Sequence, residues 1–320
     1  WAEATCSKHC SGLRAYQAFC NIQNVPHHEC LPAQEEILCA FASSFTGKMT
    51  SDAVRSKLNG IRAFHIQNNL PYNNGLRLKY TLIGLDKQAP ADSKQNERPP
   101  ITKEMLDALH EEMDLEDPKD IAIFTLATMA FYAQIRLGEL VPDWQDETLF
   151  NAKAHPTGKN LAKPHTIHGS RILHLPCTKM EQVKGEDVLL SKQNSRTDPI
   201  EALAKHITHN DIQHDTPLAS FKERHTKCKC LTKNLMLKRC NDIWTKRGLN
   251  RFTGHCFRIG GTTFYLIRGI NPDVVKTLGR WKSDAFRRYW CNLKALGILH
   301  MELMENGEIK QKERYLHPDA

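Results

Sequence analysis

The fold is decided by the stretch Gly254-His255-Cys256-Phe257-Arg258-Ile259-Gly260-Gly261, which opens a predicted helix. Positions three apart share a helix face, so His255 and Arg258 are expected to point the same way. They lie beside backbone amides at a helix start, which favour an anion. A second H-x-x-R, His168 to Arg171, runs from a polar loop into a predicted strand and is set aside on that context.

Three other pieces of sequence extend this motif. Arg136 opens Arg-Leu-Gly-Glu just past a buried helix, and Lys179 follows the first strand of a predicted hairpin. Downstream, Trp281 and Tyr289 lie eight residues apart in LGRWKSDAFRRYW. Each residue taken singly also has an ordinary structural explanation. Arg136 could be a solvated arginine, Lys179 a turn lysine, and Trp281 and Tyr289 two core aromatic residues. Their joint order is Arg, Lys, His-x-x-Arg, Trp and Tyr, which is far more specific than any one of them.

In this order the motifs resemble the tyrosine recombinase (phage integrase) family, and the chain looks most like the fungal Crypton-type recombinases of mobile elements. The resemblance is carried by LRAYQAFC and LNGIRAFHIQ near the N-terminus and, further on, by IRLGEL, CTKMEQVKGEDVLL, FTGHCFRIGGTTF and LGRWKSDAFRRYW. It implies a mainly α fold with a small β-sheet. A helical, SAM-like core-binding domain would precede an α+β catalytic domain.

The residue patterns place the domains. Residues 1–89 show four apolar-periodic helical segments, and the proline-rich polar stretch 90–100 has the composition of a linker. Residues 101–320 would form the catalytic domain. The predicted elements of both are helices at Thr5–Asn21, Gln34–Phe45, Thr50–Gln67, Leu76–Leu85, Thr102–Met113, Lys119–Ala133, Pro199–His209, Leu231–Lys246, Cys256–Arg268, Pro272–Leu278, Ser283–Trp290 and Leu293–Met304, and a hairpin of Arg171–Cys177 with Glu186–Leu190.

The resemblance also implies a role for each motif residue. Arg136 and Arg258 would bind the non-bridging oxygens of the scissile phosphate, because a guanidinium binds two oxygens in a planar fork. Tyr289 would be the nucleophile that forms a 3′-phosphotyrosine, with His255 as general base and Lys179 as the acid for the 5′ oxygen.

One position departs from the pattern of many relatives. Their His or Trp lies nine residues before the tyrosine, where this chain has Arg280. Trp281 lies eight before it. Trp281 is favoured for the role, with Arg280 as the rival and as a candidate DNA contact.

Composition permits a DNA partner without demanding one. Lys and Arg number 44 against 36 Asp and Glu, a formal charge of +8, and cationic side chains that neutralise phosphates release counterions. Double-stranded DNA is the expected partner, bound as a homotetramer because joining two duplexes takes four cleavages. The final helix is expected to dock on a neighbouring protomer or to pack on its own. The candidate phosphate contacts in the first domain are Lys57, Arg62, Arg77 and Lys79.

Hydrophobicity and cysteine content bear on membrane association, metal binding and cellular location. The longest apolar run, residues 121–135, is too short to span a bilayer, so no membrane association is expected. Eleven cysteines fit a reducing compartment, and the Cys/His groups near residues 6–10 and 225–240 lack the paired spacing of a zinc site, so no metal and no small-molecule cofactor are expected. A chromosomal substrate and the fungal resemblance suggest a nuclear location.

Two alternatives stay open from the sequence. A domesticated DNA-binding protein could keep this fold without activity, although all five core positions carry competent residues. A type IB topoisomerase would use similar residues as a monomer. Covalent trapping on DNA and relaxation of supercoiled plasmid distinguish the three.

Overall fold

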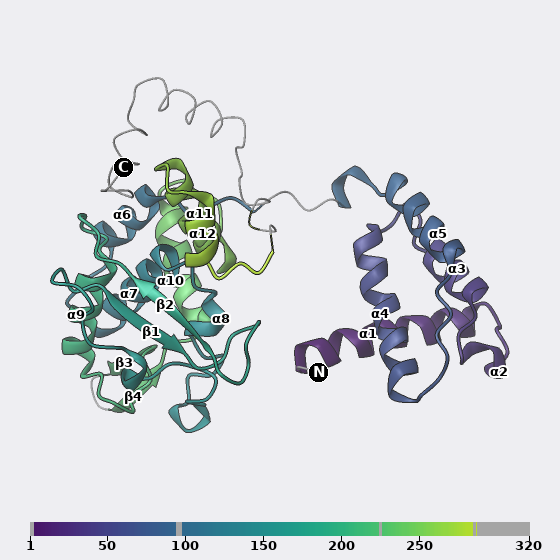
Figure 1. Cartoon of the computed structure of the whole chain (residues 1–320), viewed down its shortest axis with the longest axis horizontal. Helices are drawn as coiled ribbons and strands as arrows, with labels where there is room; N and C mark the ends of the chain where they lie inside the picture. Colours follow the sequence, from purple (N-terminus) through teal and green to yellow (C-terminus); the bar gives the residue numbers. More distant parts are fainter. Residues whose placement is uncertain (1–2, 94–97, 224–225, 284–285, 287–320) are drawn as a thin grey trace, which may run out of the picture. The chain divides into compact units, whose positions relative to one another are not determined.

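The structure is a computed structural model that describes residues 3–93, 98–223, 226–283 and 286. The chain divides into two compact units, Trp1–Asn96 and Glu97–Ala320, and each is described by itself (Figure 1). Among the described helices, none combines the length and apolar content that a bilayer crossing needs.

The first unit is helical throughout its described part. Its helices are α1 (Glu3–Ile22), α2 (His27–Cys30), α3 (Glu35–Ser43), α4 (Ser51–Gln67) and α5 (Leu76–Lys87), followed by a 3₁₀ turn at Ala91–Ser93. Glycines bring α1 and α4 together, because a Cβ at Gly12 or Gly60 would collide with the backbone of the other helix. The core of this unit contains Tyr16, Phe41 and Ile61.

The second unit is mainly helical with two small antiparallel sheets. Its helices are α6 (Lys103–Glu112), α7 (Pro118–Tyr132), α8 (Leu137–Leu140), α9 (Pro199–Asn210), α10 (Lys233–Lys246), α11 (His255–Ile267) and α12 (Pro272–Leu278), with 3₁₀ turns at Glu147–Leu149 and Gly158–Asn160. Strand β1 (Arg171–Leu175) pairs with β2 (Glu186–Leu190), and β3 (Ser220–Glu223) pairs with β4 (Thr226–Cys230).

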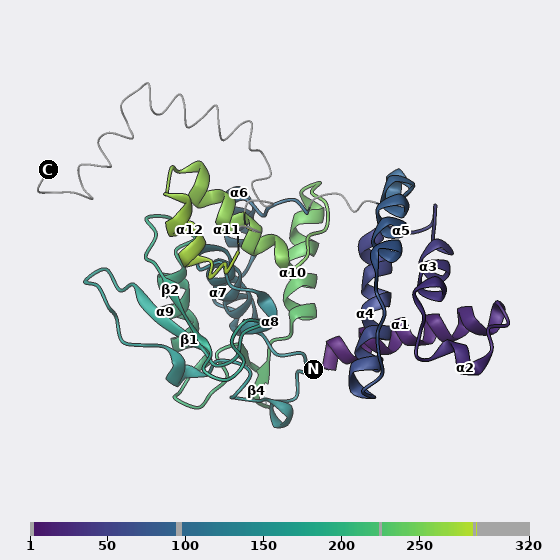
Figure 2. The ribbon, with the colours of Figure 1, turned by 45° about the vertical axis from the view of Figure 1, so that its right-hand side comes forward.

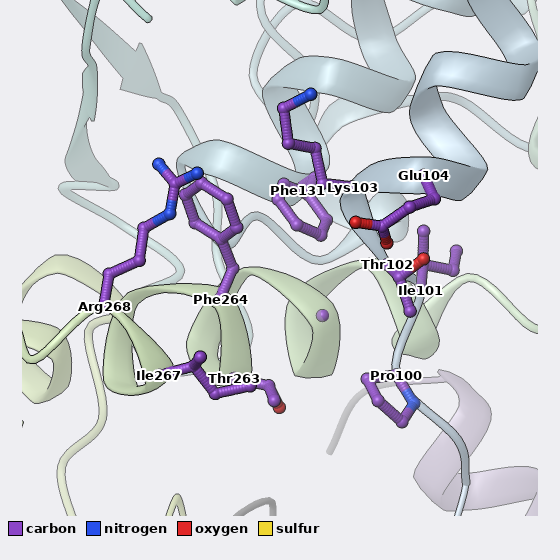
Figure 3. Close-up of a pocket in the computed structure, with 11 residues that line it drawn as sticks. Pro100, Ile101, Thr102, Lys103, Glu104, Phe131, Thr263, Phe264, Ile267 and Arg268 are labelled. Carbon is purple, nitrogen blue, oxygen red and sulfur yellow. The ribbon is translucent and has the colours of Figure 1, made fainter. Parts of the chain in front are cut away.

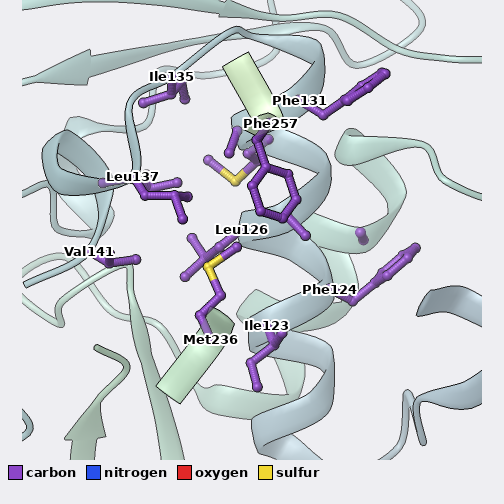
Figure 4. Packing of buried hydrophobic residues seen from close by; sticks show 14 of the residues in the cluster. Ile123, Phe124, Leu126, Phe131, Ile135, Leu137, Val141, Met236 and Phe257 are labelled. Atoms are coloured by element: carbon purple, nitrogen blue, oxygen red, sulfur yellow. The ribbon is translucent and has the colours of Figure 1, made fainter. Parts of the chain in front are cut away.

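Helix α7 is the centre of the second unit, between α9 on one side and α10 and α11 on the other (Figures 1 and 2). Asp117 caps it by accepting from the amides of residues 119 and 120, and Pro118 fits the first turn because its missing N–H is not needed there. Every residue from Asp120 to Tyr132 is buried. Figure 4 shows Met236 of α10 and Phe257 of α11 packed near Leu126.

Two adjacent glycines let α11 lie close against its neighbours. A Cβ at Gly260 would collide with the carbonyl oxygen of Ile101, and one at Gly261 with that of Phe131. This close packing sets the first turn of α11, which carries His255 and Arg258, against the C-terminal end of α7. The glycine pair therefore positions the motif that precedes it.

The structure agrees with most of the expected elements and adds three. The β1–β2 hairpin has the predicted second strand, with Leu173 opposite Val188. Short helices α2 and α8 and the β3–β4 hairpin were not predicted. The predicted segments Ser283–Trp290, apart from residues 283 and 286, and Leu293–Met304 lie outside the described residues.

Candidate active site

Arg136 is placed by the end of α7. Gln134 takes a left-handed backbone conformation (φ 50°) after the helix, and Arg136 is the N-cap residue of α8. The Arg136 Nη1 donates to Glu139 Oε1 at 2.7 Å, and the arginine side chain keeps 23% of its surface exposed. The guanidinium is thus fixed from one side and open on another.

Arg258 is held more tightly. It is fully buried in α11, where its Nη1 donates to the carbonyl oxygen of Gln134 at 2.7 Å and its Nη2 to that of Gly279. The Trp281 ring stacks on the guanidinium, with 3.9 Å from the carbon Cζ to the ring centroid. Gln134 itself is fixed by Thr262, whose hydroxyl donates to Gln134 Oε1 at 2.7 Å.

Lys179 lies in the loop between β1 and β2. Its side chain is exposed, while its backbone N–H donates to Glu139 Oε1 at 3.4 Å. Since Glu139 also accepts from Arg136, one carboxylate joins the lysine loop to the start of α8. The loop that carries Lys179 therefore lies beside Arg136.

His255 is the first residue of α11 and is half-buried. Burial lowers its pKa to about 4, helped by the positive charges of Arg258, Arg98, Arg136 and Lys179, in that order. An imidazole in this setting is neutral at pH 7 and a weak base, and the negative charge of an anion bound among these cations would raise its pKa. The four cations around it create an electrostatic site for an anion.

Arg98 was not predicted from the sequence. It is exposed and lies three residues before Ile101, whose backbone N–H donates to the carbonyl oxygen of Cys256 at 3.1 Å. Figure 3 shows Pro100 and Ile101 beside α11, where they line a groove of about 270 Å³ together with Phe264 and other residues. Because of this hydrogen bond, the segment that precedes α6 runs beside the start of α11, and Arg98 in that segment lies near His255.

Arg280 differs from its expected role as a DNA contact. Its side chain is only 8% exposed, with Nη2 donating to Glu139 Oε2 at 2.9 Å and Nη1 to Glu186 Oε2 at 3.2 Å. Both ends of the guanidinium are engaged by carboxylates, which leaves little of it for a phosphate. The sequence could not show this, because its partners lie 141 and 94 residues away along the chain.

The structure thus brings Arg136, Lys179, His255, Arg258 and Trp281 into one neighbourhood. Tyr289, the expected nucleophile, lies outside the described residues. No group of three or more His, Cys, Asp or Glu side chains within the described ranges is arranged to hold a metal ion.

The expected phosphate contacts of the first unit lie on α4 and α5. Arg62 and Lys79 are exposed, and the Lys57 ammonium lies 5.6 Å from the centroid of the Phe45 ring. Arg77 forms an exposed ion pair with Glu36 at 2.9 Å. Lys79 also lines an open groove of about 580 Å³ that includes Arg55, a cation that the sequence analysis did not select.

No sequence family and no curated protein matches the chain. Solved structures match it in three dimensions. The XerH site-specific recombinase bound to palindromic difH substrate, a post-cleavage complex, aligns with a TM-score of 0.62 and 15% identity over 93% of this chain and 79% of the XerH chain. The fold is that of the tyrosine recombinases.

Two further complexes agree. The XerH pre-cleavage complex with difH gives a TM-score of 0.53 and 16% identity over 88% of this chain and 74% of that one. The Tn1549 transposon integrase in complex with transposon right end DNA gives a TM-score of 0.55 and 11% identity over 94% of this chain and 98% of the integrase chain. The tyrosine recombinase fold therefore accounts for nearly the whole chain, with a helical unit followed by an α+β unit.

Proposed function

We propose that this protein cleaves and rejoins DNA strands by attack of Tyr289 on a backbone phosphate, in the site-specific recombination of a mobile element. The observation that carries the proposal is the convergence of Arg136, Lys179, Arg98 and Arg258 on His255 at the start of α11. Such a site has the charge to bind a phosphodiester, and the bound phosphate would raise the pKa of His255 so that it can act as the base. The shared fold with DNA-bound XerH and Tn1549 integrase supports DNA as the ligand.

The proposed reaction gives each of these residues a role. The Tyr289 oxygen forms a bond to phosphorus while the bond from phosphorus to the 5′ oxygen breaks. The phenol proton goes to His255, which is unprotonated at pH 7 and whose pKa rises when the phosphate charge offsets the surrounding cations. Arg136, which is partly exposed, neutralises charge on the non-bridging oxygens, and the buried Arg258 adds positive charge behind them. Loss of one guanidinium is expected to cost roughly 10²-fold or more in rate.

Two other groups complete the site. Lys179, on an exposed loop, gives its proton to the departing 5′ oxygen. Trp281 stacks on the face of the Arg258 guanidinium at 3.9 Å from Cζ to the ring centroid, and so holds the arginine in place. The resulting phosphotyrosine keeps the ester energy for rejoining.

The assembly and biological setting are also proposals. Lys57, Arg62 and Lys79 of the first unit would bind backbone phosphates of DNA, consistent with the +8 charge of the chain. Four protomers would act together on two duplexes, which native mass spectrometry of the DNA complex would detect. The Crypton-type origin and a nuclear location rest on the motif resemblance alone.

A covalent trapping experiment tests the proposed chemistry. In a pool of random-sequence duplexes that each carry one nick, attack a few nucleotides to the 5′ side of the nick releases a short strand with a free 5′ hydroxyl and leaves the protein attached. Wild-type protein and the control Tyr80→Phe, a change at an exposed tyrosine of α5, are expected to form the adduct, and Tyr289→Phe is not. DNA binding without an adduct would favour the inactive DNA-binding protein. Relaxation of supercoiled plasmid by a monomer would favour the topoisomerase.

A further inference from the structure

A buried ion network lies behind the lysine loop, and the reaction described above does not use it directly. Its members are Glu139, Glu186, Arg280 and Thr178, and we call it the Arg280 network. Arg280 joins three segments that are distant in sequence, since Glu139 belongs to α8, Glu186 begins β2, and Arg280 itself follows α12.

The backbone of Arg280 is unusual. It has φ 54°, a left-handed conformation that glycine, asparagine and aspartate adopt much more readily than arginine. A long cationic residue in this position costs conformational energy, so its side-chain contacts must offset that cost. The two ion pairs at 2.9 and 3.2 Å supply such contacts in a nearly solvent-free site.

The carboxylates that Arg280 binds are the ones that hold the lysine loop. Glu186 Oε2 accepts from the Thr178 hydroxyl at 2.7 Å, and the same hydroxyl oxygen accepts from the amides of Met180 at 3.3 Å and Glu181 at 3.0 Å. Glu139 accepts from the Lys179 amide at 3.4 Å. The residues on both sides of the lysine are therefore fixed by carboxylates that Arg280 brings together.

The charges of the network are also interdependent. Burial alone would raise the pKa of Glu139, but Arg280 and Arg136 hold it below the usual range, so the carboxylate stays ionised. Without Arg280, Glu139 would be a nearly buried anion with one remaining cationic partner, and Glu186 would lose its cation among the described residues.

We propose that Arg280 and Glu186 are positioning residues, which hold the Lys179 loop so that the ammonium can protonate the departing 5′ oxygen. This rests on the proposed function and assigns to Arg280 an effect on proton donation in place of a DNA contact. Neither residue touches the phosphate. Their influence passes through the backbone of residues 178–181.

A substrate with sulfur in place of the bridging 5′ oxygen tests this assignment. A thiol has a pKa near 8.5, so a thiolate leaves without a proton, whereas the 5′ oxygen needs one. Single-turnover cleavage of the oxygen substrate is expected to slow by about 10²-fold in Lys179→Ala and by about 10-fold or more in Glu186→Gln and Arg280→Lys. The sulfur substrate should restore all three to within a few-fold of wild type.

Two controls separate this role from other effects. Arg258→Lys should stay slow with both substrates, because it replaces the planar guanidinium near the phosphate and leaves the contacts of the Lys179 loop in place. Arg247→Gln, which removes exposed ion pairs with Glu111 and Glu112, should leave both rates unchanged. Equal slowing of both substrates in Glu186→Gln and Arg280→Lys would overturn the positioning role, as would weaker DNA binding with no change in the cleavage step.

A second measurement does not require activity. Hydrogen exchange at the amides of residues 179–181 should be faster in Glu186→Gln and Arg280→Lys than in wild type, while exchange in α9 is unchanged. Unchanged exchange in the loop would overturn the proposal even if the proposed function holds. If Lys179→Ala is not restored by sulfur while the wild type forms its adduct, the lysine assignment fails instead, and the role in proton donation fails with it.

Discussion

At the scale of single residues, the site depends on the charge state of His255. Burial and four nearby cations lower its pKa to about 4, so the imidazole is neutral at pH 7. Between pH 6.5 and about 4 the unfolded chain binds a proton at this residue that the folded chain does not. The contribution of His255 to the free energy of unfolding therefore rises with pH across this window, and stability is lost as the pH falls through it.

We predict that the imidazole of His255, followed by NMR in the free protein and assigned with His255→Gln, titrates near pH 4. Lys179→Gln and Arg98→Gln should each move the midpoint upward, because each removes a positive charge that opposes protonation. Lys205→Gln, at an ion pair on α9, should not move it. A wild-type midpoint near 6.5 would contradict the convergence of cations on this histidine.

The sequence predicted most of the residues that the structure brings together around His255, but not all of their contacts. Arg136, Lys179, His255 and Arg258 were selectable because their motifs stand at predictable ends of helices and strands. Arg98 was missed, since its approach to His255 depends on the hydrogen bond between Ile101 and Cys256. The buried role of Arg280 was missed for a similar reason, because ion pairing across the fold leaves no local pattern.

At the scale of elements, the sequence was sufficient where a helix has caps and a long apolar stretch. Helix α7 shows both, with Asp117 and Pro118 at its start and only buried residues from Asp120 to Tyr132. The β3–β4 hairpin was not predicted. Its second strand, Thr-Lys-Cys-Lys-Cys, has no valine, isoleucine or aromatic residue, which are the residues that usually mark a strand. Helix α8 has only four residues, too few for a periodic signal.

The glycine pair of α11 gives a prediction at this scale. Gly261→Ala should lower the free energy of unfolding of the second unit by about 3 kcal/mol, because the new Cβ would collide with the Phe131 carbonyl in a packed core. Gly138→Ala is the matched control: the position is helical and has open space around it, so the change should be neutral or stabilising by about 0.5–1 kcal/mol. Urea unfolding measures both, and equal stability of the two variants would contradict the close approach.

At the scale of the whole molecule, the two units have separate hydrophobic cores, one around Phe41 and one around α7. The positive charge is distributed over both: the first 98 residues carry 11 basic and 8 acidic side chains, and the remainder carries +5. A charge of this size attracts polyanions in general. The proposed chemistry depends on the few cations that surround His255.

The most direct test of the account is to locate the DNA on the protein. After covalent trapping with the nicked duplex pool, nuclease and protease digestion followed by mass spectrometry should find a nucleotide joined through its 3′ phosphate to Tyr289 and to no other residue. An adduct that persists in Tyr289→Phe, or a linkage at another side chain, would contradict the central claim.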